Sequence, residues 1–257
     1  MKLEEIIDLD KYDLSNMNFQ TECHDIFEEE GVLILPNFIS QKAIEAIKIE
    51  GIEKQNSAYY CVEKHNPYLM PTDENYSVDH PRNKQVVSSK GCIADDQISK
   101  NSALKTLYNA KKFKEFLSYV LQENSLYPYA DEVSPINLHY AQTGQELGWH
   151  YDNSSFAITL MVQPADEGGE FEYVRNVRNA DSGEMNFEGT DKVVTGKIEP
   201  NRISLPAGAL VMFRGRNAIH RVTSNLGETT RMLVVLAYNS KPGVMISDTA
   251  RKLFYGR

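Results

Sequence analysis

The chain has 257 residues, a formal net charge of −9 and three widely spaced cysteines. It contains no run of Lys and Arg to contact phosphates, no CxxC pair and no apolar N-terminal signal segment, and no stretch reaches the ~18 apolar residues of a membrane helix. These features argue against nucleic-acid and membrane partners and against a disulfide framework, and we expect a single cytoplasmic domain over residues 1–257.

The first 56 residues or so predict helices around one buried strand. Residues 19–30 have helical character that Gly31 ends, and GVLILPNF over 31–38 is typical of a buried strand. Ser40 is placed to cap a helix over 41–54. The residues of that helix expected to face inward are Ile44, Ile47 and Ile52.

The next segment, residues 57–100, is rich in Asn, Asp, Pro and Tyr and has no sustained period. We expect long loops here, which cover another part of the molecule. Residues 101–124 then carry apolar side chains at helical spacing and predict a second amphipathic helix.

The character of the chain changes after residue 133. Short runs rich in β-branched and aromatic residues follow one another, separated by Gly, Pro and Asn, and no helical pattern lies between them. They predict a β-sandwich or closed barrel over 133–257, with 1–132 as helical support and covering loops. The eight runs are INLHYAQ, FAITLMVQP, GGEFEYV, KVVTGKI, RISLPAG, ALVMFRG, AIHRVTS and TRMLVVLAY.

Two histidines and one carboxylate form the candidate metal site. His150 and Asp152 are two residues apart at the expected start of a strand, so their side chains would point to the same face, and His220 lies on a later predicted strand. This donor set is the facial triad of non-haem iron(II), which leaves coordination positions open for a chelating co-substrate and O2.

Arg231 follows His220 with ten residues between them, at the start of the last long predicted strand. The segment SNLGETT between them predicts a hairpin turn, so we expect the two strands to be adjacent and antiparallel. A guanidinium inside the barrel can bind a carboxylate in a bidentate pair.

Together, these motifs resemble the iron(II)/2-oxoglutarate-dependent oxygenase superfamily. Over residues 137–257 the chain resembles a bacterial branch that hydroxylates or halogenates free amino acids, including lysine. The strings that carry the resemblance are QELGWHYDNSSFAITLMVQP, EGGEFEYVRNVR, LPAGALVMFRGRNAIHRVTS, KLFYGR and, for the wider superfamily, FEEEGVLILPNFIS. The resemblance implies a double-stranded β-helix, also called a jelly roll or cupin-like core, flanked by helices.

The resemblance also implies roles. His150, Asp152 and His220 would hold Fe(II), and Arg231 would bind 2-oxoglutarate, the co-substrate that is consumed with O2. Halogenases of this branch carry Gly or Ala where Asp152 stands, which leaves room for chloride. Because the carboxylate is present here, we expect hydroxylation of an unactivated C–H bond, with release of succinate and CO2.

The sequence indicates the substrate-binding residues less clearly than the metal ligands. Where the lysine-handling members carry polar contacts, this chain has Val235, Ala237 and Asn153, which argues for a smaller or less cationic substrate than lysine. Arg82, in the covering segment, is a candidate partner for a substrate carboxylate, and Tyr255 could fold over the pocket. Asn153 would contact the substrate only if a bulge turned it inward.

The remaining histidines and acidic residues are assigned structural roles. His139 is expected to be a satisfied strand residue because the triad is already complete. The surface or loop histidines would be His24, His65 and His80, and Asp131 with Glu132 would form a solvated turn before the barrel.

Several alternatives to a free-amino-acid hydroxylase stay open. The same chemistry could act on a peptide or protein, on a nucleotide or on a carrier-bound amino acid, and it could end in desaturation or cyclisation. A different class of protein, a cupin-like module that binds metal without turnover, would have no need of Arg231. The pattern leaves the oligomeric state undetermined.

Overall fold

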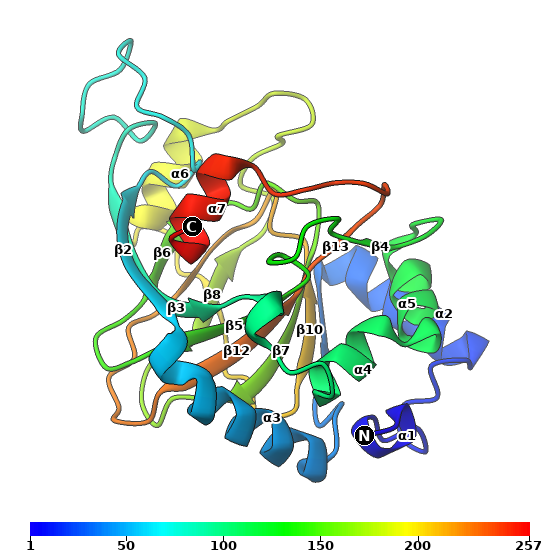
Figure 1. Cartoon of the computed structure of the whole chain (residues 1–257). Coiled ribbons are helices and arrows are strands. Elements are labelled where there is room, and N and C mark those ends of the chain that lie inside the picture. Colours follow the sequence, from blue (N-terminus) through cyan, green and yellow to red (C-terminus); the bar gives the residue numbers. More distant parts are fainter.

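The computed structural model describes the backbone of residues 1–257 and all side chains except those of Thr249, Ala250 and Leu253. Helices dominate the N-terminal half, and an antiparallel barrel occupies the rest (Figure 1). Among the described residues, no helix combines the length and the apolar character needed to cross a membrane. The N-terminal elements are α1 (Leu3–Ile6), α2 (Met17–Glu30), β1 (Val32–Leu35), α3 (Gln41–Lys54) and a 3-10 turn (Gln55–Ser57).

The start of the chain follows the predicted pattern closely. Gly31 adopts a left-handed conformation with φ 66° and ends α2, and β1 follows directly. The Ser40 side chain accepts a hydrogen bond from the Ala43 amide and caps α3. One expectation is wrong, because Ile52 is 52% exposed. Gly51 faces the sheet instead, and its carbonyl accepts a hydrogen bond of 2.7 Å from the Tyr140 hydroxyl.

The expectation of loops throughout residues 57–100 is also wrong in part. This segment contains an antiparallel pair, β2 (Tyr59–His65) and β3 (Val86–Ile93), and a short 3-10 turn (Asp95–Gln97). The pair escaped notice because β2 lies at the edge with one face exposed, and because β3 buries polar residues such as Ser88 and Ser89. Only residues 66–85, between the two strands, form the expected long loop.

The predicted helix over residues 101–124 is two helices, α4 (Ala103–Asn109) and α5 (Lys111–Leu121). Ala110 separates them in an extended conformation, with ψ 123°. The apolar faces of both helices are buried as predicted, and they join the large core that lies against the outside of the barrel.

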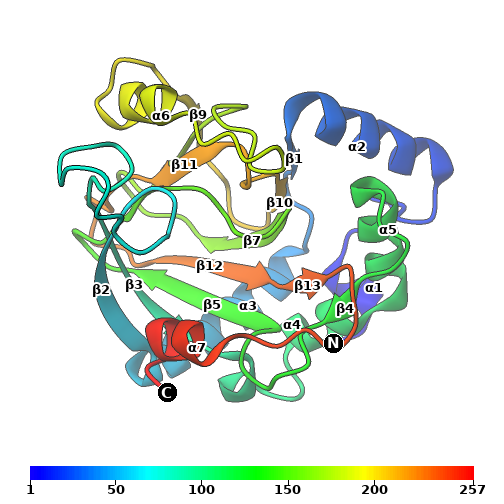
Figure 2. The same cartoon turned by 90° about the horizontal axis from the view of Figure 1, so that it is seen from above.

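The strands of the barrel form two groups in one curled antiparallel sheet (Figure 2). One group has the order β1-β10-β7-β12-β5-β3 and the other the order β6-β11-β8-β9, and they meet where Ser88 pairs with Leu147. This is the expected jelly-roll core with flanking helices. The additional strands are β4 (Tyr127–Pro128), β5 (Ile136–Ala141), β6 (Leu147–His150), β7 (Ala157–Gln163), β8 (Phe171–Val174), β9 (Asn201–Ile203), β10 (Leu210–Phe213), β11 (Ile219–Val222), β12 (Arg231–Leu236) and β13 (Tyr238–Asn239).

One of the eight predicted strands is wrong. Most of KVVTGKI belongs to α6 (Phe187–Val194) and the turn after it. Asn186 caps this helix by accepting a hydrogen bond from the Gly189 amide, and Thr190 and Val193, three residues apart, form its buried face. A helical period with a cap therefore overrides the β-branched composition of the segment.

Strand β12 divides its side chains between two cores. Met232, Val234 and Leu236 pack into the large core with the helices, whereas Leu233 faces a smaller cluster inside the barrel. The last helix, α7 (Asp248–Tyr255), returns to lie beside β2 and β3 (Figure 2).

Candidate active site

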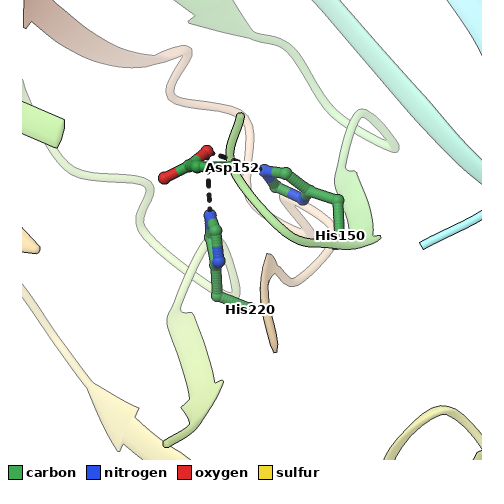
Figure 3. Close-up of side chains that lie close together, drawn as sticks. All are labelled: His150, Asp152 and His220. Atoms are coloured by element: carbon green, nitrogen blue, oxygen red, sulfur yellow. Dashed lines mark ion pairs between the residues drawn. The ribbon is translucent and has the colours of Figure 1, made fainter. Parts of the chain in front are cut away.

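The three predicted metal ligands come together at one end of the barrel (Figure 3). His150 and His220 occupy paired positions on β6 and β11, and Asp152 follows the end of β6. The Nε2 atoms of His150 and His220 lie 3.9 and 3.6 Å from Asp152 Oδ1. The expectation that the His-x-Asp segment begins a strand is wrong, because β6 ends at His150.

The backbone fixes how both imidazoles point. His150 Nδ1 lies 2.8 Å from the Gly148 carbonyl oxygen, and His220 Nδ1 lies 3.0 Å from the Ala218 carbonyl oxygen. A carbonyl can only accept, so each Nδ1 carries the proton and donates it. Each Nε2 is therefore left with a free lone pair that points toward Asp152, as a metal ligand requires.

The electrostatics of His150 and Asp152 agree with this arrangement. Burial, and then the neighbouring His220, lower the pKa of His150 to about 3, so its imidazole is neutral at physiological pH. Burial alone would raise the pKa of Asp152, but His220 and His150 outweigh burial and hold that pKa below its ordinary value. Two imidazoles and one carboxylate form the donor set of a facial triad for iron(II).

The Asp152 carboxylate is held in place by Gly215, a residue that the sequence did not mark. The Asp152 amide donates a hydrogen bond of 3.0 Å to the Gly215 carbonyl. A Cβ on Gly215 would overlap the Asp152 carboxylate and lie 2.9 Å from His220 Cε1. Asp152 Oδ2 is buried and has no hydrogen-bond partner among the described residues, which fits a carboxylate whose partner is a metal ion.

Arg231 lies inside the barrel as predicted, at the first position of β12. It is 6% exposed, and its Nε is buried with no hydrogen-bond partner in the described part of the chain. Burial lowers the pKa of the guanidinium to about 10, so it stays charged. Gly169 makes room for it, because a Cβ there would lie 3.0 Å from Arg231 Cδ. A buried, unpartnered guanidinium fits a ligand carboxylate.

The expected pairing of the His220 and Arg231 strands is wrong. β11 pairs with β6 and β8, whereas β12 pairs with β5 and β7, so the two strands lie in opposite groups. The connection crosses between the groups and is held by the fully buried Asn225, whose amide donates to the carbonyls of Ala141 and Thr229. Arg231 therefore lies in the group of strands opposite to the one that carries His150 and His220.

The four histidines outside the triad lie in different surroundings. His65 is not a surface residue as expected: its ring centroid is 6.3 Å from that of His150, and its Nε2 lies 2.6 Å from Ser88 Oγ. His139 has Lys90 Nζ 3.4 Å from both of its ring nitrogens and is not among the metal ligands. His24 and His80 lie away from the triad, His24 against the Val120 carbonyl and His80 stacked on Tyr76.

The predicted substrate residues differ in their surroundings. Arg82 is 7% exposed, and its Nη1 is buried with no hydrogen-bond partner among the described residues. Tyr255 is 8% exposed and donates a hydrogen bond to Asn137 Oδ1 on β5. Asn153 is exposed, and its backbone carbonyl accepts a hydrogen bond from Arg216. Asp131 forms a turn as expected, and it accepts hydrogen bonds from backbone amides, including that of Val133.

A cluster of side chains that packs beside the triad segment was not predicted. The rings of Tyr68 and Tyr151 stack at 5.5 Å, and both hydroxyls lie 2.8 Å from Thr190 Oγ1 on α6. The Arg178 guanidinium lies 4.0 Å from the centroid of the Tyr151 ring. Tyr151 stands between His150 and Asp152 in the sequence, which was the one signal available, but its partners are distant along the chain.

Several solved structures have a similar fold. The alpha-ketoglutarate-dependent epimerase SnoN from nogalamycin biosynthesis matches with a TM-score of 0.60 at 10% identity, covering 87% of this chain and 81% of that one. A 2OG-Fe(II) oxygenase-family oxidoreductase from Burkholderia pseudomallei matches with a TM-score of 0.54 at 13% identity, covering 89% and 94%. A Pseudomonas putida prolyl-4-hydroxylase matches with 0.51 at 11%, covering 84% and 96%. At such identities the likeness shows the fold.

At the level of sequence, no curated protein matches the chain. The model of the family named Halogenase D, in contrast, matches residues 15–252, which is nearly the whole chain. The chain therefore belongs to the Halogenase D family, and it has the fold of the 2-oxoglutarate- and iron(II)-dependent oxygenases.

Proposed function

We propose that this protein is an iron(II)- and 2-oxoglutarate-dependent oxygenase that hydroxylates an unactivated C–H bond of a free amino acid or a related small molecule. Succinate and CO2 would be the other products. One observation carries the proposal: Asp152 lies between two imidazoles whose Nε2 atoms point toward it, and the barrel also holds Arg231, whose buried Nε has no described partner.

The residues of the chain have separate tasks in this reaction. His150, Asp152 and His220 would hold the iron, and Arg231 would bind the distal carboxylate of 2-oxoglutarate. Bound together with O2, these groups supply the oxidising power that an unactivated C–H bond requires. The protein positions the substrate beside the metal and keeps water out, and the apolar cluster that includes Phe213, 4.9 Å from the His220 ring, serves the second task.

Asp152 supports hydroxylation over halogenation within the Halogenase D family. A halide bound to the metal needs a coordination position, and here a carboxylate fills the position between the two imidazoles. Its backbone amide is tied to Gly215, so the carboxylate is a built part of the site and not an accidental neighbour. An oxygen atom is therefore the group that we propose the enzyme transfers.

The elements around the triad support a small substrate. Pro67, at the start of the loop over residues 66–85, accepts a hydrogen bond of 2.8 Å from the Tyr151 amide, so this loop is fastened beside the metal ligands. On the other side α7 lies beside β2 and β3, and the Tyr255 hydroxyl reaches β5. Arg82, buried and with Nη1 unpartnered, would bind the carboxylate of a free amino acid.

Turnover with defined substrates tests the proposal. Iron-loaded protein with 2-oxoglutarate and O2 is given each free amino acid in turn, and succinate and product masses are recorded. The expected result is succinate that rises with one class of amino acid, together with a product heavier by one oxygen. A chlorinated product in the presence of chloride would overturn hydroxylation, and failure to bind 2-oxoglutarate would overturn the whole proposal.

A further inference from the structure

A second cation lies inside the barrel beside the proposed site. Lys90, on β3, pairs with Cys61, and its Nζ lies 3.4 Å from both ring nitrogens of His139 on β5. The same atom lies 5.4 Å from the centroid of the Phe254 ring on α7. The ammonium is thus enclosed between the barrel wall and the C-terminal helix.

Nothing described around Lys90 balances its charge. Its described contacts are an imidazole and an aromatic ring, and no described carboxylate forms an ion pair with it. The imidazole is uncharged, because burial, and then Lys90 and Arg231, lower the pKa of His139 well below its ordinary value. Burial also lowers the pKa of Lys90, which Cys92, Cys61 and Asp152 partly oppose. A partly buried cation without a counter-ion is desolvated at a cost, so its retention points to an anionic ligand.

In the proposed site, the charge of Lys90 has no opposite charge to balance it. Asp152 would be neutralised in part by iron, and Arg231 would be paired with the distal carboxylate of 2-oxoglutarate. Iron(II) and 2-oxoglutarate carry equal and opposite charges, and Asp152 and Arg231 do so as well. Apart from Arg82, which the proposed function assigns to the α-carboxylate of the substrate, the loaded site would therefore retain one positive charge, which Lys90 carries.

We propose that Lys90 binds a side-chain carboxylate of the primary substrate, so that the enzyme acts on an acidic amino acid of the aspartate or glutamate class. This inference rests on the proposed function. Arg82 would bind the α-carboxylate, and Lys90 would select the end of the substrate that enters the barrel. A cationic side chain such as that of lysine would be repelled by Lys90, and a neutral one would leave its charge unpaired.

The binding test uses manganese(II)-loaded protein, so that no turnover occurs. Calorimetry measures the Kd for 2-oxoglutarate first, and then for L-aspartate and L-glutamate against their neutral amides L-asparagine and L-glutamine and against L-lysine. The variant is Lys90→Met, with Lys90→Arg to retain the charge. The matched control is Lys64→Met, which removes an exposed lysine from β2 of the same hairpin.

The expected wild-type result is that one acidic amino acid binds at least about tenfold more tightly than its amide, which corresponds to about 1.4 kcal/mol. Lys90→Met should abolish this preference while the Kd for 2-oxoglutarate changes less than about threefold, and Lys90→Arg should retain part of the preference. Lys64→Met should behave as the wild type.

Three results would overturn the inference, and they are distinguishable. If Lys90→Met weakens 2-oxoglutarate binding as strongly as Arg231→Met does, Lys90 serves the co-substrate. If the wild type binds 2-oxoglutarate and a neutral or cationic amino acid but prefers no acidic one, the substrate class is wrong while the proposed function stands. If metal-loaded protein binds no 2-oxoglutarate, the proposed function fails as well.

Discussion

The Asp152 carboxylate lies directly against the backbone of Gly215, so that a Cβ at position 215 would overlap it. The contact joins the segment after β6 to the segment after β10, because the Asp152 amide also donates a hydrogen bond of 3.0 Å to the Gly215 carbonyl. The position of the only carboxylate in the described metal site therefore depends on a residue that has no side chain.

We expect Gly215→Ala to displace Asp152 and to weaken metal binding by about 10- to 100-fold, as changes around metal ligands do. Titration of the metal-free protein with manganese(II) or iron(II) measures this effect. Ser155→Ala, in the exposed turn after Asp152, is the control and should leave the affinity unchanged. An affinity within about threefold of wild type would show that Asp152 tolerates the added methyl group.

Substitutions of Asp152 test whether turnover requires its carboxylate. Asp152→Ala is expected to lower substrate-dependent succinate formation by at least about 100-fold, because a ligand of the metal is lost. Asp152→Asn keeps the shape of the side chain and should also lose activity, because it lacks the charge. Recovery of hydroxylation by Asp152→Asn to near the wild-type rate would contradict the role of the charge.

Arg231→Met should raise the KM for 2-oxoglutarate by roughly 100-fold or more, since a buried charge-assisted pair is lost. The same change removes a buried cation that has no protein partner for its Nε, so the ligand-free variant should be as stable as the wild type or more stable. Thermal unfolding with and without 2-oxoglutarate checks both parts. A ligand-free variant that unfolds at a clearly lower temperature would argue for a structural role of Arg231.

The buried histidines make the metal-free protein sensitive to acid. The pKa of His150 is about 3 in the folded chain against an ordinary value of 6.5, and that of His139 is lowered as well. The unfolded chain therefore takes up protons that the folded chain does not as the pH falls below 6.5. Above that pH these histidines do not change the free energy of unfolding with pH. Below it, each of them lowers the free energy of unfolding by about 1.4 kcal/mol per pH unit.

We expect His139→Gln to make this decline shallower by the equivalent of one proton. Urea unfolding of the metal-free variant and wild type between about pH 5 and 6.5, where Asp and Glu contribute little, measures the two slopes. Equal slopes would mean that His139 is protonated in the folded protein.

Tyr255→Phe tests the covering role of α7. The variant loses the hydrogen bond to Asn137 while the ring remains, which we expect to cost about 1 kcal/mol and to raise the KM for the amino acid about fivefold. The KM for 2-oxoglutarate should not change, because Arg231 is untouched. Steady-state kinetics with each substrate varied in turn distinguishes this outcome from a general loss of stability, which would affect both constants.

The barrel strands and the metal ligands could be predicted because their signals are local. Apolar runs between Gly and Pro mark the strands, and the two-residue spacing of His150 and Asp152 marks two of the three triad residues. Arg231 lies at the start of its strand and is buried as predicted, although that strand lies in the opposite group from that of His220. The error has a physical reason, since a short turn signal does not distinguish a hairpin from a crossing between sheets.

The remainder of the site depends on pairing between distant segments. Lys90 and His65 reach the barrel through the β2–β3 pair, whose buried positions mix Ser88 and Ser89 with Cys92 and Ile93 and so lack an apolar period. Gly215 is needed only because Asp152 packs against it, and no pattern around residue 215 records that contact. α6 was missed for the opposite reason, because its adjacent valines are typical of a strand.

The two faces of β12 allow the ligand preference of this barrel to be changed without changing its fold. Because Met232, Val234 and Leu236 hold the strand to the helices, the interior positions Leu233 and Val235 can vary with little effect on the architecture. Libraries restricted to these two positions should yield a high fraction of folded variants with altered ligand preference. A one-residue insertion in the strand, in contrast, would exchange the two faces and abolish both folding and co-substrate binding.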